Sequence, residues 1–162
     1  MTEVRIEPWG AGDQPLLEQL VGDPAMMEHL GGPESAEKIA ERQGRYEVPG
    51  SGMFKILWAG EGCGSVGFWE REWRNRMVYE VGWSVIPSFQ GRGIAVAATA
   101  LVLERARAGE HRFVHAFPAV DNPGSNAICR RLGFTLLEVC RFEYPPGNWM
   151  TCNDWQLDLA VE

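Results

Sequence analysis

The stretch Val85–Ala95 constrains the fold of this chain most, because it joins a strand-like segment to a helix through a glycine-rich loop. Pro87 ends an apolar run over 77–86. The residues of 93–108 are mostly Ala, Leu and Val, with charges only near the end, which is typical of a buried helix. At such a junction the backbone amides of the first helical turn have no partner within the helix and bind anions. The stretch therefore predicts a phosphate site.

Two glycines in this loop favour close approach of a diphosphate to the backbone. Gly91 and Gly93 lack side chains, and Arg92 between them can add positive charge. A dinucleotide fingerprint would need Gly or Ala where Val96 stands, and an acidic residue about 20 positions further on. A P-loop would need a Gly-Lys-Ser/Thr sequence, which is absent. Neither of these two phosphate-binding motifs fits the loop.

The loop pattern has a known counterpart. Gln90-x-x-Gly93-x-Ala95 resembles the Q/R-x-x-G-x-G/A signature of the GNAT N-acetyltransferase superfamily. A second block, 122–134 (NPGSNAICRRLGF), is similar to the family's segment in which an Asn begins a helix that ends in Gly-Phe. The resemblance covers about 78–142. The stretch 80–87 is similar to the branch that includes ribosomal-protein N-terminal acetyltransferases and some aminoglycoside acetyltransferases.

The resemblance implies that acetyl-coenzyme A (acetyl-CoA) is the co-substrate. In the family the loop amides hold the diphosphate, and the pantetheine lies between two parallel strands that splay apart, here 77–86 and 112–117. Asn122 contacts the pantetheine in this scheme, and it is also suited to cap the helix before Pro123. The cofactor-binding residues implied by the resemblance are Val85, Gln90, Gly91, Arg92, Gly93, Ile94, Ala95, Asn122 and Ser125.

Acetyl transfer to an amine needs a base that generates the neutral amine. Glu80 stands where the family often places a catalytic Glu, and strand alternation puts it on one face with Val78, Gly82 and Ser84. Partial burial would raise its pKa and help it to accept a proton near neutrality. The alternative is a Glu at the sheet edge that only pairs with a cation.

The leaving thiolate needs a proton, and its source is less clear from the sequence. Many relatives have a Tyr at the position of Cys129. A thiol could take that role, although a single Cys in a helix is more often a small core residue. Ser125 and Tyr144 are other possible donors, and transfer without a protein acid is a further alternative.

The pattern of apolar residues predicts an α+β chain with a single domain over 1–162, which the resemblance implies is an acetyltransferase domain. We expect a central mixed, mostly antiparallel, twisted sheet of about seven strands with helices on both faces. Asp13 is suited to cap a short helix that carries Leu16, Leu17 and Leu20. The other elements are expected as a first strand over 4–8, a polar helix over 34–47, strands over 53–58, 65–69, 77–86, 112–117 and 134–142, helices over 93–108 and 123–132, and a last strand around 155–159.

Charge and composition limit the partners. The chain has 15 basic and 22 acidic residues, a formal net charge of −7, which disfavours nucleic acid and favours cationic acceptors such as amines. The first 30 residues contain no apolar run, so we expect a cytoplasmic protein without a membrane span. Many members of the resembled family are dimers, and a homodimer is possible. No metal site is expected from the spacing of Cys63, Cys129, Cys140, Cys152, His29, His111 and His115.

Two functions fit these observations. The first is an acetyl-CoA-dependent N-acetyltransferase that acts on a protein N-terminus or on a small-molecule amine. The second is a non-catalytic acyl-CoA sensor that keeps the loop. The acceptor would be bound by the N-terminal helices and by the segments 71–76 and 144–149. Arg130 and Arg131 are candidates for the 3′-phosphate from their charge alone.

Overall fold

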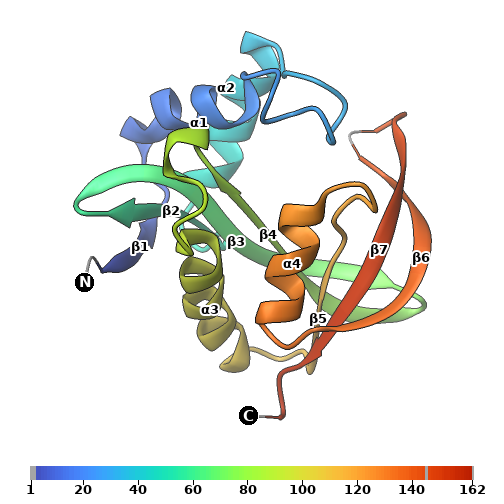
Figure 1. The fold of residues 1–162 in the computed structure, drawn as a ribbon. Coiled ribbons are helices and arrows are strands. Elements are labelled where there is room, and N and C mark those ends of the chain that lie inside the picture. The colour runs from blue at the N-terminus through green and yellow to red at the C-terminus, as the bar shows by residue number, and fades with distance from the viewer. Residues whose placement is uncertain (1–2, 145, 162) are drawn as a thin grey trace.

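A seven-stranded sheet organises the part of the chain that the computed structural model describes, residues 3–144 and 146–161 (Figure 1). The strand order is β1-β2-β3-β4-β5-β7-β6, and every neighbouring pair is antiparallel except β4 and β5. The strands are β1 (Val4–Pro8), β2 (Met53–Trp58), β3 (Glu61–Trp73), β4 (Arg76–Val85), β5 (Phe113–Ala116), β6 (Thr135–Glu143) and β7 (Trp149–Asp158).

Helices cover both faces of the sheet (Figure 1). They are α1 (Gln14–Val21), α2 (Ala36–Tyr46), α3 (Ile94–Arg107) and α4 (Pro123–Arg131). The pair α1 and α2 lies on the other side of the sheet from α3, and α4 stands beside α3. This arrangement confirms the expected mixed α+β fold. Among the described helices, none combines the length and apolar character needed to cross a bilayer.

Alternate residues of β2 show how the two layers form. Phe54 and Ile56 pack into the main core, which α3 also joins through Ala98 and Val102. Met53 instead packs against a second cluster under α1 and α2. Because successive side chains of a strand point to opposite faces, one apolar strand serves both layers.

The β3–β4 hairpin is longer than its sequence indicates. The charged stretch 71–76 was expected to separate two strands, but it continues both of them, and only Arg74 and Asn75 form the turn. Their φ angles of 53° and 63° lie in the left-handed region that two-residue hairpin turns require. The turn sets the register, so that Trp69 pairs with Glu80.

The parallel pair β4 and β5 is short. Only Tyr79 with Val114 and Glu80 with His115 are in register, although β4 continues to Val85. Beyond these two pairs the strands separate. A wedge between two parallel strands is thus a structural feature of this sheet, as the resemblance implied.

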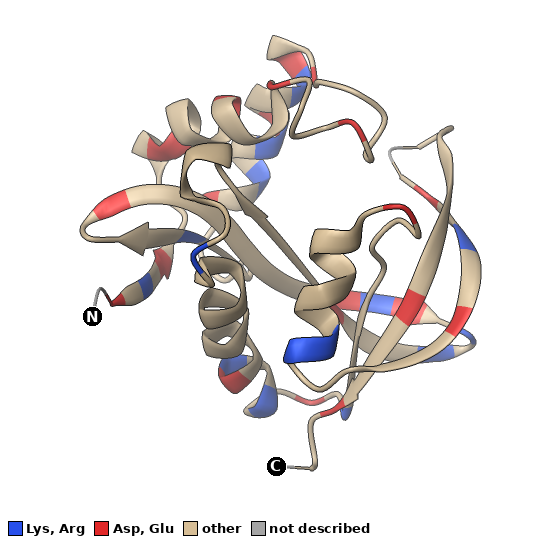
Figure 2. Cartoon of the chain, in the orientation of Figure 1, with Lys and Arg blue, Asp and Glu red and all other residues tan. Residues whose placement is uncertain are grey.

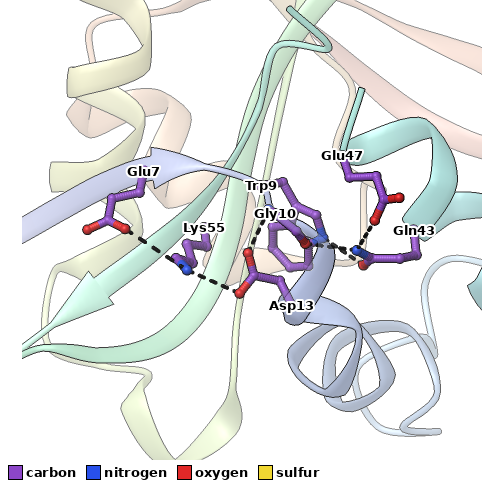
Figure 3. A network of polar contacts seen from close by, with 7 residues as sticks. All are labelled: Glu7, Trp9, Gly10, Asp13, Gln43, Glu47 and Lys55. Atoms are coloured by element: carbon purple, nitrogen blue, oxygen red, sulfur yellow. Dashed lines mark hydrogen bonds and ion pairs between the residues drawn. The ribbon is translucent and has the colours of Figure 1, made fainter. Parts of the chain in front are cut away.

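A buried amide joins α2 to the end of β1 (Figure 3). Gln43 Oε1 accepts from Trp9 Nε1 at 2.8 Å, while Gln43 Nε2 donates to the Gly10 carbonyl at 2.9 Å and to Glu47 at 2.9 Å. Asp13 lies at the start of α1, but its carboxylate accepts from the Gly10 amide and pairs with Lys55. Asp13 therefore fixes the turn before α1 and does not cap that helix with its side chain.

Replacing Gln43 with Leu tests this link. The change removes the amide with its three hydrogen bonds and leaves the buried Trp9 Nε1 without an acceptor, so we expect a loss of about 1–3 kcal/mol in the free energy of unfolding. Urea denaturation measures the loss. The matched control is Gln19→Leu on the exposed side of α1, which should change stability by less than about 0.5 kcal/mol. Equal stability of the two variants would contradict the prediction.

Candidate active site

A cavity of about 1060 Å³ opens where β4 and β5 separate. Its wall includes the end of β4, the segment after β5, the loop before α3 and the first turn of α4. The side facing α1 and α2 is lined by residues such as Met27, Arg42 and Tyr46. A cavity of this size suits a large, extended ligand. All site residues expected from the sequence except Arg92, Arg130 and Cys129 line this one space.

The loop before α3 has the backbone shape that anion sites require. Gly91 and Gly93 have φ angles of 78° and 77°, and Gly93 is the cap residue of α3. The side chain of Gln90 donates to the Val85 carbonyl at 2.8 Å, which ties the loop to the end of β4. Amides of the first turn of α3 have no carbonyl to bind within the helix, and the helix dipole adds positive potential there.

The remaining loop residues divide into two groups. Val85, Ile94 and Ala95 line the cavity together with the two glycines. Arg92 points elsewhere, because its guanidinium lies over the ring of Trp58 at 4.8 Å from the centroid. The backbone of this loop, more than the Arg92 charge, faces the cavity.

The first turn of α4 places two polar side chains at the cavity. Asn122 Oδ1 accepts from the Ser125 amide at 3.1 Å, which confirms Asn122 as the helix cap. Trp83 Nε1 donates to Ser125 Oγ at 3.3 Å. Because this hydroxyl oxygen accepts from Trp83, its own proton is left to donate. Asn122 and Ser125 both line the cavity.

Glu80 lies on the wall of the same cavity, with its side chain 14% exposed. Its Oε1 atom accepts from Trp69 Nε1 at 3.2 Å and from Arg71 Nη1 at 3.1 Å. Burial raises the pKa of Glu80 above its ordinary value, and Arg71 and Trp69 oppose that rise. The carboxyl group is thus held at one oxygen and biased towards accepting a proton.

Arg71 was not named individually from the sequence, although it orients Glu80. Its guanidinium lies 4.3 Å from the centroid of Phe142 and also faces Phe117. Recognising the two-residue turn at 74–75 would have identified Arg71. That turn pairs Trp69 with Glu80, and Arg71 lies two residues after Trp69 on the same face of β3.

Cys129 lies one helical turn after Ser125 but away from the cavity. Its side chain is fully buried in the main core, and burial raises its thiol pKa to about 12. Residues of the cavity wall on this helix are Gly124, Ser125, Ala127, Ile128 and Arg131. Glu80 and Ser125 therefore line the same cavity, whereas Cys129 is buried in the core and does not line it.

The side of the cavity that faces α1 and α2 is crossed by a polar link between α2 and the segment after β6. Arg42 forms an ion pair with Glu34 and donates to the Tyr46 hydroxyl at 3.1 Å and to the Tyr144 hydroxyl at 2.7 Å. Burial raises the pKa of Tyr144, although Arg42 opposes this. The Tyr144 oxygen is therefore engaged in a structural bond.

Basic residues gather at the C-terminal turn of α4 (Figure 2). Arg131 lines the cavity, whereas the Arg130 guanidinium lies over the ring of Trp155 at 5.5 Å from its centroid. Of the two candidates for a phosphate contact, Arg131 is the one at the cavity wall.

The family follows from a comparison with protein-family models. Residues 3–135 match the acetyltransferase (GNAT) domain. The chain belongs to the GNAT acetyltransferase family. The glycine loop, the separating strands and the Asn-capped helix described above lie within the matched range, so this GNAT domain contains the candidate site.

Solved structures similar to this GNAT chain share its whole fold. RimL, the ribosomal L7/L12 α-N-protein acetyltransferase in complex with coenzyme A, is 25% identical over 98% of this chain and 96% of its own, with a TM-score of 0.78. The *Salmonella typhimurium* enzyme that modifies the N-terminal serine of L7/L12 is 25% identical over 96% and 94%, with a TM-score of 0.76. Spermidine N-acetyltransferase from *Vibrio cholerae*, solved with coenzyme A and spermine, is 16% identical over 97% and 96%, with a TM-score of 0.79. A search of curated proteins finds no match.

Proposed function

We propose that this chain is an acetyl-CoA-dependent N-acetyltransferase that transfers an acetyl group to a primary amine by direct attack on the thioester. The observation that carries the proposal is the wedge between β4 and β5. The glycine loop, Glu80 and Ser125 all line the cavity that opens there. Cofactor site, base and proton donor thus share one space.

The residues present fit acetyl-CoA along the length of this cavity. The loop over 90–95 supplies backbone amides for the diphosphate, with φ angles at Gly91 and Gly93 that a larger side chain would strain. The gap between the strands offers unpaired backbone groups to the amide-containing pantetheine arm, and Asn122 lies at its edge. Arg131 is our candidate for the 3′-phosphate.

The reaction needs two proton movements. Glu80 accepts a proton from the acceptor ammonium and so produces the neutral amine, which attacks the thioester carbonyl. As the carbon–sulfur bond breaks, the Ser125 hydroxyl donates its proton to the thiolate and takes in exchange the second proton that the attacking nitrogen loses. Free thiol and the neutral amide are then released, and the hydroxyl is restored. We assign these roles to Glu80 and Ser125 because both line the cavity, whereas Cys129 is buried with a pKa of about 12.

The acceptor is a primary amine on a protein N-terminus or on a small molecule. The similar RimL structures concern the L7/L12 N-terminus, and the similar *Vibrio* structure contains spermine. The formal charge of −7 and the carboxylate of Glu80 favour a cationic acceptor. Release of free thiol with a panel of such amines distinguishes an enzyme from an acyl-CoA sensor, which would bind acetyl-CoA without turnover.

Substituting Gly93→Asp tests the cofactor site. A carboxylate at this position would strain a residue with φ of 77° and repel the diphosphate. We expect calorimetric titration with coenzyme A to show micromolar binding to the wild-type protein and at least a hundredfold weaker binding to the variant, about 2.7 kcal/mol. Gly60→Asp, in the β2–β3 turn with φ of 80° and open space around it, is the matched control and should bind normally. Equal loss in both variants would argue against a loop-specific effect.

Substituting Glu80→Gln tests the base. The carboxylate is the active form, so the wild-type kcat/KM should fall as the pH decreases through the raised pKa of Glu80. The variant should lose this acid limb and about 10²–10⁴ in rate. Thiol-release assays across pH measure both effects. An unchanged rate and pH profile, with binding of coenzyme A intact, would remove Glu80 from the mechanism.

The matched substitutions Ser125→Ala and Cys129→Ala separate the two candidate acids. Each removes one heteroatom from α4, one turn apart. We expect Ser125→Ala to lower kcat by about tenfold or more, and Cys129→Ala to change it by less than about threefold. Thermal melting shows whether Cys129→Ala remains folded. The reverse order of the two losses would assign the proton donor to Cys129.

A further inference from the structure

A buried ion-pairing histidine lies behind the candidate active site and has no part in the steps proposed above. His115 on β5 and Asp154 on β7 are each 2% exposed, and His115 Nδ1 is 2.6 Å from Asp154 Oδ1. The other carboxylate oxygen of Asp154 accepts from Trp73 Nε1 at 3.0 Å. Two bonds to one carboxylate thus fix the imidazole ring.

This histidine is the direct neighbour of Glu80 across the parallel pair. Glu80 and His115 form one of the two registered pairs of β4 and β5, and paired residues of adjacent strands share a face about 5 Å apart. A positive charge on His115 lowers the pKa of Glu80 and so opposes the effect of burial. The end of strand pairing therefore places a titratable ring beside the proposed base.

A second cavity reaches the pair from another side. It has a volume of about 570 Å³, and its wall includes His115, Asp154 and Gln156. The first cavity is lined by Glu80 and by Ala116 and Phe117, which follow His115, but not by His115 itself. Protons can thus reach His115 from solvent while a ternary complex fills the first cavity.

The side chain of Gln156 suits both charge states of the ring. Its Nε2 atom is 3.4 Å from His115 Nε2. An amide can present its NH₂ group to a neutral ring nitrogen or, after a flip, its oxygen to a protonated one. Asp154 retains the bond to Nδ1 in either state.

We propose that His115 is a positioning residue that acts on Glu80 through its charge, with Asp154 fixing its ring and the second cavity connecting it to solvent. When His115 is protonated, Glu80 is held as the carboxylate that accepts the proton of the amine. The inference rests on the proposed role of Glu80 as the base.

Of the arginines around His115, two are ion-paired, and Arg76 lies over the ring of Phe113 at 4.3 Å from its centroid. The thiols near them are neutral. Arg71 pairs with Glu80, and Arg74 pairs with Glu138. Burial raises the thiol pKa of Cys140 to about 11 and of Cys152 to about 12. The charged groups facing His115 are Glu80 on β4, Arg71 on β3, Arg74 and Arg76 at the β3–β4 turn, Glu138 on β6 and Asp154 on β7.

Kinetics of His115→Asn across pH test the proposal. Asn cannot carry a positive charge, so the acid limb of kcat/KM should move to higher pH by about one unit. The control is His111→Asn, which removes another histidine paired with a carboxylate, Glu70, at 2.7 Å on the surface. That variant should leave the limb in place. An unmoved limb in folded His115→Asn protein would overturn the inference.

A second measurement, on the wild-type protein, needs no turnover and no variant of His115 or Asp154. Carbon-13 NMR follows the Glu80 carboxyl resonance, assigned from its absence in Glu80→Gln, while proton signals follow the His115 ring. Coupled groups titrate together, so the Glu80 curve should show an inflection at the pH where His115 changes state. A Glu80 curve without that inflection would overturn the inference. Absence of acetyl transfer alongside a shared inflection would instead reject the proposed enzyme and keep the coupling.

Discussion

The short parallel pairing of β4 and β5 is the constraint on which the candidate site depends. Two registered residue pairs hold the strands together at Glu80 and His115, and after them the strands separate. The separation ends the pairing of the two strands, and the cavity opens there. Because β4 leads directly into the glycine loop, the same strand brings the proposed base and the diphosphate site to one cavity. Its partner β5 leads towards Asn122 and Ser125.

Polar groups beside the separation of β4 and β5 stabilise the charged form of the buried Glu80 carboxyl group. An isolated carboxylate in an apolar setting is driven towards its neutral form. Here Arg71 and Trp69 bind Glu80 at one oxygen, and the aromatic rings of Phe117 and Phe142 face the Arg71 guanidinium. The balance leaves the pKa of Glu80 raised but the side chain ordered. Such a group can accept a proton and retain its orientation.

The sequence predicts the features that depend on local residue patterns better than those that depend on contacts between distant residues. The strand, glycine loop and helix around 85–108 have strong local signatures, and the structure contains each of them. The hairpin of β3 and β4 is longer than the sequence predicts, because charged residues at 71–76, which favour a loop, continue both strands. The His115–Asp154 pair was not foreseen, since the two residues are 39 positions apart and meet only through the pairing of β5 with β7.

Helix α4 shows why residue type alone could not assign the proton donor. Ser125 and Cys129 are four residues apart, so both lie on the same side of the helix, separated by about 6 Å along its axis. The cavity reaches Ser125 in the first turn, where Trp83 also binds its hydroxyl. One turn later that side of the helix faces the main core, and Cys129 packs there. A thiol is more acidic than a hydroxyl in water, but burial reverses the advantage by raising the Cys129 pKa to about 12. Position along the helix, and not intrinsic acidity, therefore favours Ser125.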